Sequence, residues 1–138
     1  MEESIRYRKR DYKYQLVDDY VVMTPVKGYD VKSDFFHLKR SGVLIISAGY
    51  AWDGPSGPTF DTKDFMRGSL VHDALYQMMR EKLIPLNCKD AADQTLYDIC
   101  REDGMGWVRA KYVLWGVKRY GDGACEPGSS DYEIQTAP

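Results

Sequence analysis

A histidine, an aspartate and a tyrosine stand in the middle of the chain with a spacing suited to chemistry, at His72, Asp73 and Tyr76. On a helix, His72 and Tyr76 share the apolar side, whereas Asp73 points about 100° away from His72. A histidine that faces a core needs polar partners for its ring nitrogens. Asp93 can be such a partner, because it projects at the edge of the next apolar stripe and a buried acid is costly unless it is paired.

This predicted pair has two interpretations. In the first, Asp93 orients His72 and raises its basicity, His72 activates a water molecule, and Asp73 holds a cation or polarises a substrate. In the second, the pair is a buried hydrogen-bonded clasp between two helices, without turnover. Spacing alone leaves both interpretations open.

A segment rich in glycine and proline precedes the histidine. Residues 49–59 contain three glycines, two prolines and a single acid, Asp53. Such a loop turns sharply, exposes backbone amides and carbonyls, and can hold one carboxylate rigidly. We expect this loop to lie beside His72 and to contact the substrate through Tyr50, Trp52, Gly54 and Ser56. The alternative is a tight crossover from sheet to helix in which Asp53 caps backbone amides.

The donors near this loop decide which metal ion could bind. Asp53, Asp73, the further candidate Asp61 and the loop carbonyls offer oxygen ligands, which suit a hard divalent cation such as calcium or magnesium. Zinc is disfavoured because the chain has only two histidines, His37 and His72, and neither lies near a cysteine pair. The three cysteines are an odd number without C-x-x-C spacing, so we expect reduced thiols.

The elements that position these residues follow from the periodicity of apolar residues. Strand-like runs lie at residues 20–24, 29–31, 35–38 and 43–47, and the last run is continuous enough to predict a strand covered on both faces. Helical periodicity follows at about residues 64–80, 89–102 and 106–120. Asp61 or Thr62 can cap the first helix, and Asn87 can cap the second.

This order predicts an α+β fold: N-terminal antiparallel β-strands, a Gly/Pro-rich loop, and then three packed α-helices. The short connection 81–88 predicts that the first two helices pack antiparallel. With 138 residues the chain has the length of one domain, which we place at residues 1–121. Residues 122–138 carry four acids and no base and are expected to form a flexible tail.

Charge and hydropathy restrict the partners. The net charge of −2 argues against bulk capture of nucleic acid. The polar start of the chain has no signal-peptide core, and no apolar run approaches the ~18 residues that a membrane span needs. Residues 6–10 are basic and are expected to form a solvated arm.

The third predicted helix carries an aromatic and basic face. Trp107, Lys111, Trp115 and Lys118 project away from its apolar stripe. Such a face can contact a membrane interface or nucleic acid. The favoured expectation is that it packs on the N-terminal strands while the lysine side chains reach water.

These motifs together resemble an uncharacterised family of small phage and prophage proteins. The matching residues are Gly49-Tyr50, Asp53, Ser56, Pro58, Val71-His72-Asp73, Leu75-Tyr76, Ala92-Asp93 with Leu96, and Tyr120-Gly121. The resemblance covers about residues 43–121. It implies a bacteriophage context and a location in the cytoplasm of the host cell or in the virion, and it implies no established activity.

A more distant likeness is to secreted calcium-dependent phospholipases of the A2 type. They also place a Gly-rich loop before a helix with His-Asp-x-x-Tyr, and a later helix supplies an aspartate that orients the histidine. The likeness implies that His72 is the general base, Asp73 a calcium ligand, Asp93 the orienting acid and Tyr76 a supporting hydrogen-bond donor. This chain lacks the many cysteines of those enzymes.

Two functions are therefore expected from the sequence. The first is a phage-encoded, metal-assisted hydrolase that acts on an ester or a lipid-like small molecule. The second is a non-catalytic phage structural or assembly protein, or a factor that binds a host protein, in which the His72–Asp93 pair is a structural clasp.

Overall fold

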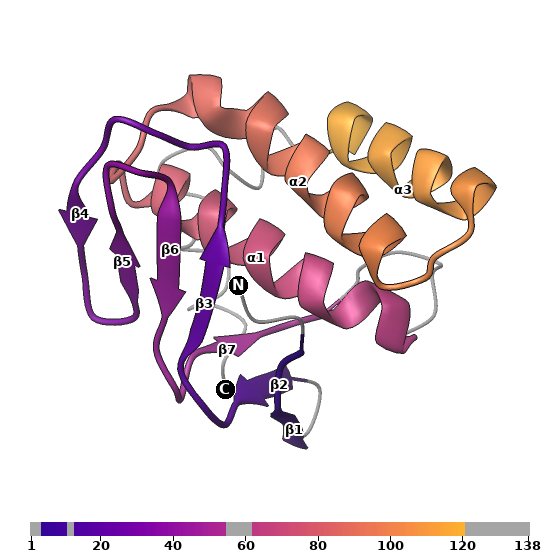
Figure 1. The fold of residues 1–138 in the computed structure, drawn as a ribbon, viewed down its shortest axis with the longest axis horizontal. Helices are drawn as coiled ribbons and strands as arrows, with labels where there is room; N and C mark the ends of the chain where they lie inside the picture. Colours follow the sequence, from indigo (N-terminus) through magenta and orange to yellow (C-terminus); the bar gives the residue numbers. More distant parts are fainter. Residues whose placement is uncertain (1–3, 11–12, 55–61, 121–138) are drawn as a thin grey trace.

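The computed structural model describes residues 4–10, 13–54 and 62–120. Strands occupy the N-terminal half and helices the C-terminal half, which confirms the predicted α+β class (Figure 1). The strands are β1 (Tyr7–Arg10), β2 (Lys13–Leu16), β3 (Tyr20–Met23), β4 (Val31–Lys32), β5 (Phe36–Leu38), β6 (Val43–Ile46) and β7 (Ala51–Trp52). The helices are α1 (Lys63–Arg80), the 3-10 turn η1 (Leu86–Cys88), α2 (Lys89–Glu102) and α3 (Trp107–Tyr120). The predicted tail, residues 122–138, lies outside the described residues.

The strands of the described residues form two antiparallel sheets, with the orders β1-β2-β7 and β3-β6-β5-β4. In the larger sheet, β6 pairs with β3 on one side and with β5 on the other. Burial alternates along β6: Leu44 and Ile46 lie in the core, and Val43 and Ile45 are partly exposed. The expectation that this strand is covered on both faces is therefore wrong, because the antiparallel sheet packs only one face against the core.

The smaller sheet was not predicted. The basic residues 6–10, expected to be a solvated arm, contribute the edge strand β1, whose Lys and Arg side chains are typical of a protected sheet edge. Strand β7 lies inside the segment predicted to be a loop and pairs with β2 through Tyr14 and Trp52. The rings of Tyr7, Tyr14 and Trp52 pack together with centroids between 5.5 and 6.0 Å apart. These ring contacts join the three strands of the sheet.

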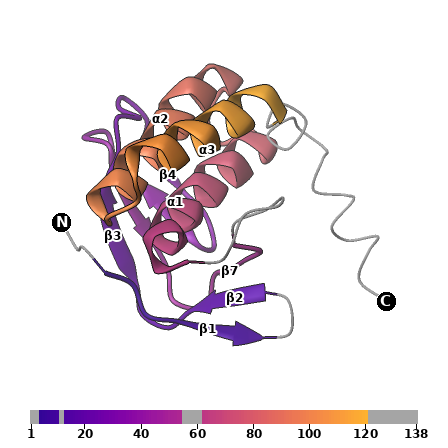
Figure 2. The same cartoon turned by 90° about the vertical axis from the view of Figure 1, so that its right-hand side faces the viewer.

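Helix α1 lies between the sheets and α2 (Figures 1 and 2). Its predicted apolar stripe is buried, and so are most of its other side chains, because strands cover one side and α2 the other. Helix α2 runs antiparallel to α1, as predicted. Gly68 of α1 contacts Cys100 of α2, and His72 contacts Asp93. His72 follows Gly68 by one turn, whereas Asp93 precedes Cys100 by two turns. The two helices therefore place the predicted pair at their interface.

The helix ends agree with the predicted ranges but not with every predicted cap. Thr62 is the N-cap residue of α1, although its side chain makes no capping hydrogen bond. The prediction that Asn87 caps α2 is wrong, because Asn87 lies within η1, which continues directly into α2 with Cys88 at the N-cap position. Gly104 follows α2 with a φ of +100°, a conformation that glycine adopts without strain.

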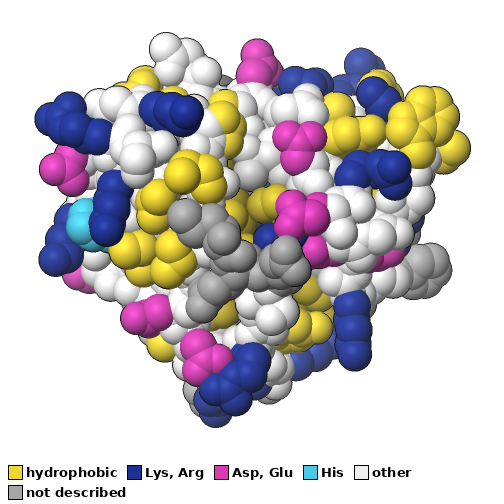
Figure 3. All heavy atoms as spheres, viewed as in Figure 1, with side chains coloured by type: hydrophobic (Ala, Val, Ile, Leu, Met, Phe, Trp, Pro, Cys, Tyr) yellow, Lys and Arg dark blue, Asp and Glu magenta, His cyan; other side chains and the backbone are white. Residues whose placement is uncertain are grey.

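Helix α3 packs on α2 and not on the strands. Its residues Ala110 and Val113 are buried in a small core with Leu96 and Cys100. The expectation that its aromatic and basic face packs on the N-terminal strands is therefore wrong, since α1 and α2 lie between α3 and the sheets. Figure 3 shows this end of the molecule at the upper right, where hydrophobic and basic side chains are exposed. No helix among the described residues is both long enough and apolar enough to span a membrane.

Candidate functional site

The site begins with a direct contact between α1 and α2. His72 Nε2 lies 2.8 Å from Asp93 Oδ1, and both residues are buried, at 6% and 0% exposure. The helical period places His72 on the side of α1 that faces α2, which is why the sequence predicts this contact. Because Asp93 is a carboxylate acceptor, the neutral ring carries its proton on Nε2 and its lone pair on Nδ1.

Asp93 accepts hydrogen bonds from two further side chains. The Tyr76 hydroxyl donates to Oδ1 over 2.6 Å, and its ring lies against the imidazole of His72 with centroids 4.0 Å apart. Lys89 Nζ donates to Oδ2 over 2.8 Å and also to the Val117 carbonyl of α3 over 3.1 Å. Sequence reasoning missed Lys89, although its position four residues before Asp93 is a signal for an ion pair on one helix face.

These contacts shift the pKa values of the pair in opposite directions. Burial alone would lower the pKa of His72, but the carboxylates of Asp73 and Asp93 favour the protonated ring, so the pKa is raised. Burial alone would raise the pKa of Asp93, but hydrogen bonds from His72, Lys89 and Tyr76 lower it. The pair is therefore an imidazole of increased basicity beside a firmly ionised carboxylate.

The second ring nitrogen of His72 lies toward Asp73. Nδ1 is 3.9 Å from Asp73 Oδ1, which is too long for a hydrogen bond. The side chain of Asp73 is 34% exposed, whereas the side chains of His72 and Asp93 are 8% and 0% exposed. Partial burial raises the pKa of Asp73, and the nearby Asp53 carboxylate raises it further, while His72 opposes both effects.

The described residues do not by themselves form the predicted cation site. Asp53 follows β7, is mostly exposed, and lies 3.6 Å from Lys13 Nζ, which competes with a cation for this carboxylate. Among residues 4–10, 13–54 and 62–120, no group of three or more His, Cys, Asp or Glu side chains could hold a metal ion. The other predicted ligand, Asp61, lies outside the described residues.

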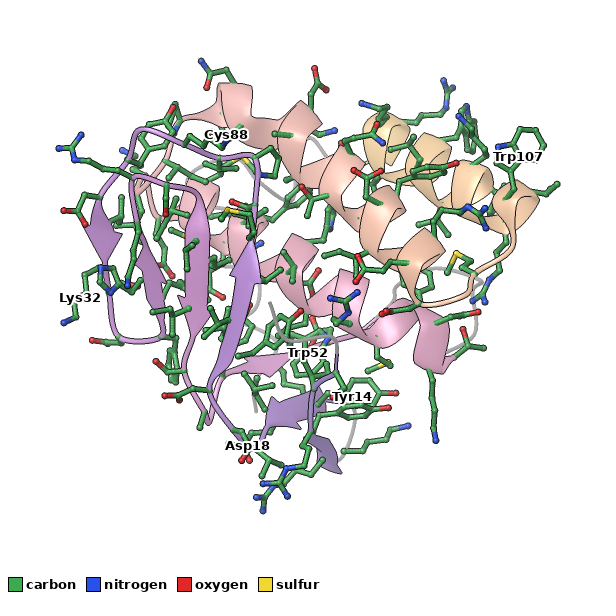
Figure 4. The ribbon with its side chains drawn as sticks, in the orientation of Figure 1. Tyr14, Asp18, Lys32, Trp52, Cys88 and Trp107 are labelled. Carbon is green, nitrogen blue, oxygen red and sulfur yellow. The ribbon has the colours of Figure 1, made fainter. Side chains whose placement is uncertain are left out.

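Two of the predicted substrate contacts lie in the core. Tyr50 packs its ring on Phe36, and its hydroxyl donates to Gln77 Oε1 over 3.2 Å. Trp52 lies beside the ring of Tyr14 (Figure 4), and its Nε1 donates to Ser69 Oγ of α1 over 3.0 Å. These contacts position β7 against α1, next to the residues that flank His72.

Gly54 lies at the end of the described part of the loop. It has a φ of +81°, and a Cβ atom there would come within 2.5 Å of the Tyr14 ring. Glycine at this position therefore lets the chain leave β7 over the aromatic ring. The remaining predicted contact, Ser56, lies outside the described residues.

A buried arginine is the main polar feature that sequence reasoning missed. Arg67 donates three hydrogen bonds to Asp103 at the end of α2, 2.8 to 3.2 Å long, and one to the Tyr20 hydroxyl of β3 over 3.0 Å. Its Nη2 also lies 2.9 Å from Glu102 Oε1. Burial alone would lower the pKa of Arg67, but Asp103 and Tyr20 raise it. This cluster connects β3, α1 and the end of α2, and Arg67 lies five residues before His72 on α1.

In comparisons with known proteins, no family model matches the chain, and no similar protein was found among curated proteins or solved structures. The phage family and the phospholipase likeness therefore stay predictions from sequence motifs.

Proposed function

We propose that this chain is a hydrolase in which His72 is the general base and the substrate is an ester or a lipid-like small molecule. The observation that carries the proposal is the bond between His72 Nε2 and Asp93, which leaves Nδ1 facing the partly exposed Asp73. General-base catalysis needs a base that a buried acid orients and that keeps its other nitrogen for a water molecule, and the position of Nδ1 beside a partly exposed carboxylate supports this role. The motif resemblance supports a phage or prophage origin.

In the proposed reaction, a water molecule between Nδ1 and Asp73 transfers a proton to Nδ1 while its oxygen attacks the ester carbonyl carbon. The resulting imidazolium is stabilised by the Asp93 carboxylate. When the tetrahedral intermediate collapses, the C–O bond to the alcohol breaks and the departing oxygen takes the proton from Nδ1. Asp73 orients the water molecule, and Tyr76 and Lys89 hold Asp93 in place.

The two histidines of the chain allow a matched test. His37 of β5 also lies near an aspartate, at 3.8 Å from Asp30, but on the sheet surface. We expect His72→Gln to lower hydrolysis of p-nitrophenyl butyrate or phosphatidylcholine at least ~100-fold, because general-base catalysis contributes at least that factor. His37→Gln should leave the rate unchanged. An equal effect of the two substitutions would contradict the proposal.

Access to His72 can be tested without knowing the substrate. In a His37→Gln background, His72 is the only histidine, so reaction with diethyl pyrocarbonate followed by ultraviolet absorbance reports on the imidazole of His72 alone. We expect the native protein to react and Asp73→Asn to react as well. If His72 reacts only after unfolding, a molecule of the size of a small ester cannot reach the ring and the hydrolase proposal fails.

A structural clasp in a non-catalytic phage protein is the second candidate. It is favoured by Asp93, which is fully buried and has three hydrogen-bond donors, His72, Tyr76 and Lys89. Under this alternative, His72→Gln and Asp93→Asn lower the free energy of unfolding, and pyrocarbonate does not react with the folded protein.

A further inference from the structure

The outer side of α3 is an exposed apolar surface. Its large hydrophobic side chains are 52–71% exposed: Trp107 at 60%, Val108 at 71%, Tyr112 at 54% and Trp115 at 52%. At 100° per residue they fall within an arc of about 140°, opposite the buried Ala110 and Val113. Exposed single hydrophobics are common, but four on one helix face are the mark of an interaction surface.

The same arc carries positive charge. Lys111, Lys118 and Arg119 project between the aromatic side chains, and the α3 sequence contains no acidic residue. Lys111 Nζ lies over the Tyr97 ring and the Arg119 guanidinium lies over the Trp115 ring, at 5.2 and 5.8 Å from the centroids. Lys118 Nζ lies 3.4 Å from the exposed Asp90 of α2. We call these three cations and the four hydrophobic residues the α3 outer face.

The α3 outer face is unobstructed by the rest of the described chain. Helix α3 is the outermost layer, and Trp107 lies at the edge of the molecule, pointing away from α2 (Figure 4). The helix of 14 residues is about 21 Å long, so it can lie flat on a surface along its whole length.

We infer that the α3 outer face binds an anionic membrane surface. Tryptophan and tyrosine rings combine an apolar body with a polar edge and favour the headgroup level of a bilayer. Lysine and arginine between them can pair with lipid phosphates while their stems cover apolar surface. The aliphatic Val108, the most exposed of the four hydrophobic residues, favours insertion into acyl chains over stacking on nucleobases. This attachment does not depend on any activity at His72.

The test is co-sedimentation of the full chain with phosphatidylcholine vesicles that contain phosphatidylglycerol, compared with vesicles of phosphatidylcholine alone. We expect binding to the anionic vesicles that weakens in high salt, because exposed charges are screened. Tryptophan emission should shift to the blue on binding, since Trp107 and Trp115 enter a less polar environment while Trp52 is already buried. Vesicles with brominated acyl chains should quench this emission.

Two double substitutions separate the apolar and the electrostatic parts of the binding. Trp107→Ser with Trp115→Ser should lower partitioning to anionic vesicles at least tenfold. Lys118→Gln with Arg119→Gln should lower it roughly 30-fold at low salt, from about 1 kcal/mol for each basic residue near an anionic surface.

Matched controls lie on the sheet side of the molecule. Lys39→Gln with Arg40→Gln makes the same charge change at two exposed neighbouring residues, and Met23→Ser replaces an exposed hydrophobic residue of β3. Neither control should change partitioning. All variants should melt like the native chain, because the replaced side chains are exposed.

The proposal is overturned if the native chain does not bind anionic vesicles, or if the control substitutions weaken binding as much as those in α3. It is also overturned if the α3 substitutions abolish a concentration-dependent dimer, or binding to a single-stranded oligonucleotide, while vesicle binding stays unchanged. In those cases the occupant of the face is a second copy of the chain or a nucleic acid.

Discussion

Gly68 of α1 and Cys100 of α2 lie in direct contact, so close that a Cβ atom on Gly68 would come within 2.8 Å of Cys100 Sγ and 3.0 Å of Leu96 Cδ1. This contact sets the distance between the two helices. One turn further along α1, the same distance lets His72 reach Asp93 at 2.8 Å. A side chain at Gly68 would therefore change the candidate site as well as the core.

Gly68→Ala should destabilise the protein by about 1–3 kcal/mol, the usual cost of overpacking a core, despite the better helix propensity of alanine. The control is Gly116→Ala in α3, where a new Cβ meets nothing within 4 Å. It should stabilise the protein by up to ~1 kcal/mol through helix propensity alone. Urea unfolding measures both changes, and the same sign for both would contradict the packing argument.

Asp93→Asn should lower the free energy of unfolding by about 3 kcal/mol, because it removes the carboxylate that pairs with His72 and Lys89 in a buried site. Asp98→Asn is the control, since it makes the same change on an exposed part of α2 and should have no measurable effect. A small effect of Asp93→Asn in urea unfolding would show that the pair is not important for stability.

The raised pKa of His72 predicts how stability depends on pH. A raised pKa in the folded state means that protonation of His72 favours folding. The contribution of His72 to the free energy of unfolding is therefore complete below about pH 6.5 and is lost as the pH rises through the folded-state pKa of His72. His72→Gln should remove this loss. NMR titration of the imidazole gives the pKa directly, and a value below that of a free histidine would refute the assignment.

The raised pKa of His72 affects catalysis and stability in opposite directions as the pH rises. A general base must be neutral, so the hydrolysis rate should increase as the pH rises through the raised pKa of His72. In Asp93→Asn, which removes a charge that favours the protonated ring, the increase should occur at lower pH. A rate profile that is flat across the imidazole titration would argue against His72 as the base.

Arg67→Met should destabilise the protein by about 3–5 kcal/mol, because it leaves the Asp103 carboxylate and the buried Tyr20 hydroxyl without their donor. Arg6→Met is the control: Arg6 also pairs with an acid, Asp18, but on the surface, where solvent screens the interaction. Thermal melting should separate the two substitutions clearly, and similar melting temperatures would show that the buried cluster contributes little.

The predicted divalent cation remains open to a direct test. If residues outside the described ranges complete a site with Asp53 and Asp73, calcium or magnesium should raise the melting temperature with concentration. Asp73→Asn should abolish this stabilisation and His72→Gln should spare it. Melting that is unchanged in both ions would contradict the predicted cation site. It would leave the reaction proposed for His72 untouched, because that reaction uses no metal.

Much of the helical half could be predicted because its signals are local. The ranges of the three helices and the meeting of His72 with Asp93 follow from the 3.6-residue period and from a connection too short for anything but antiparallel packing. Lys89 was missed although its spacing to Asp93 is equally local. Arg67 was missed because its partners, Asp103 and Tyr20, lie 36 and 47 residues away in sequence.

The sequence by itself determined the α+β class, the helices and the acid that faces the histidine. The periodicity of apolar residues and the short connection between α1 and α2 determine these features, and both signals extend over a few residues only. Tertiary contacts decided the rest. Residues 7–10 of the basic segment became a strand because β2 pairs with them, and Trp52 entered the core because Tyr14 and Ser69 lie beside it. The face of α3 stayed exposed because α2 and α1 separate it from the sheets. Contacts between residues far apart in the sequence depend on which surfaces of the folded chain meet, and local sequence patterns do not predict that.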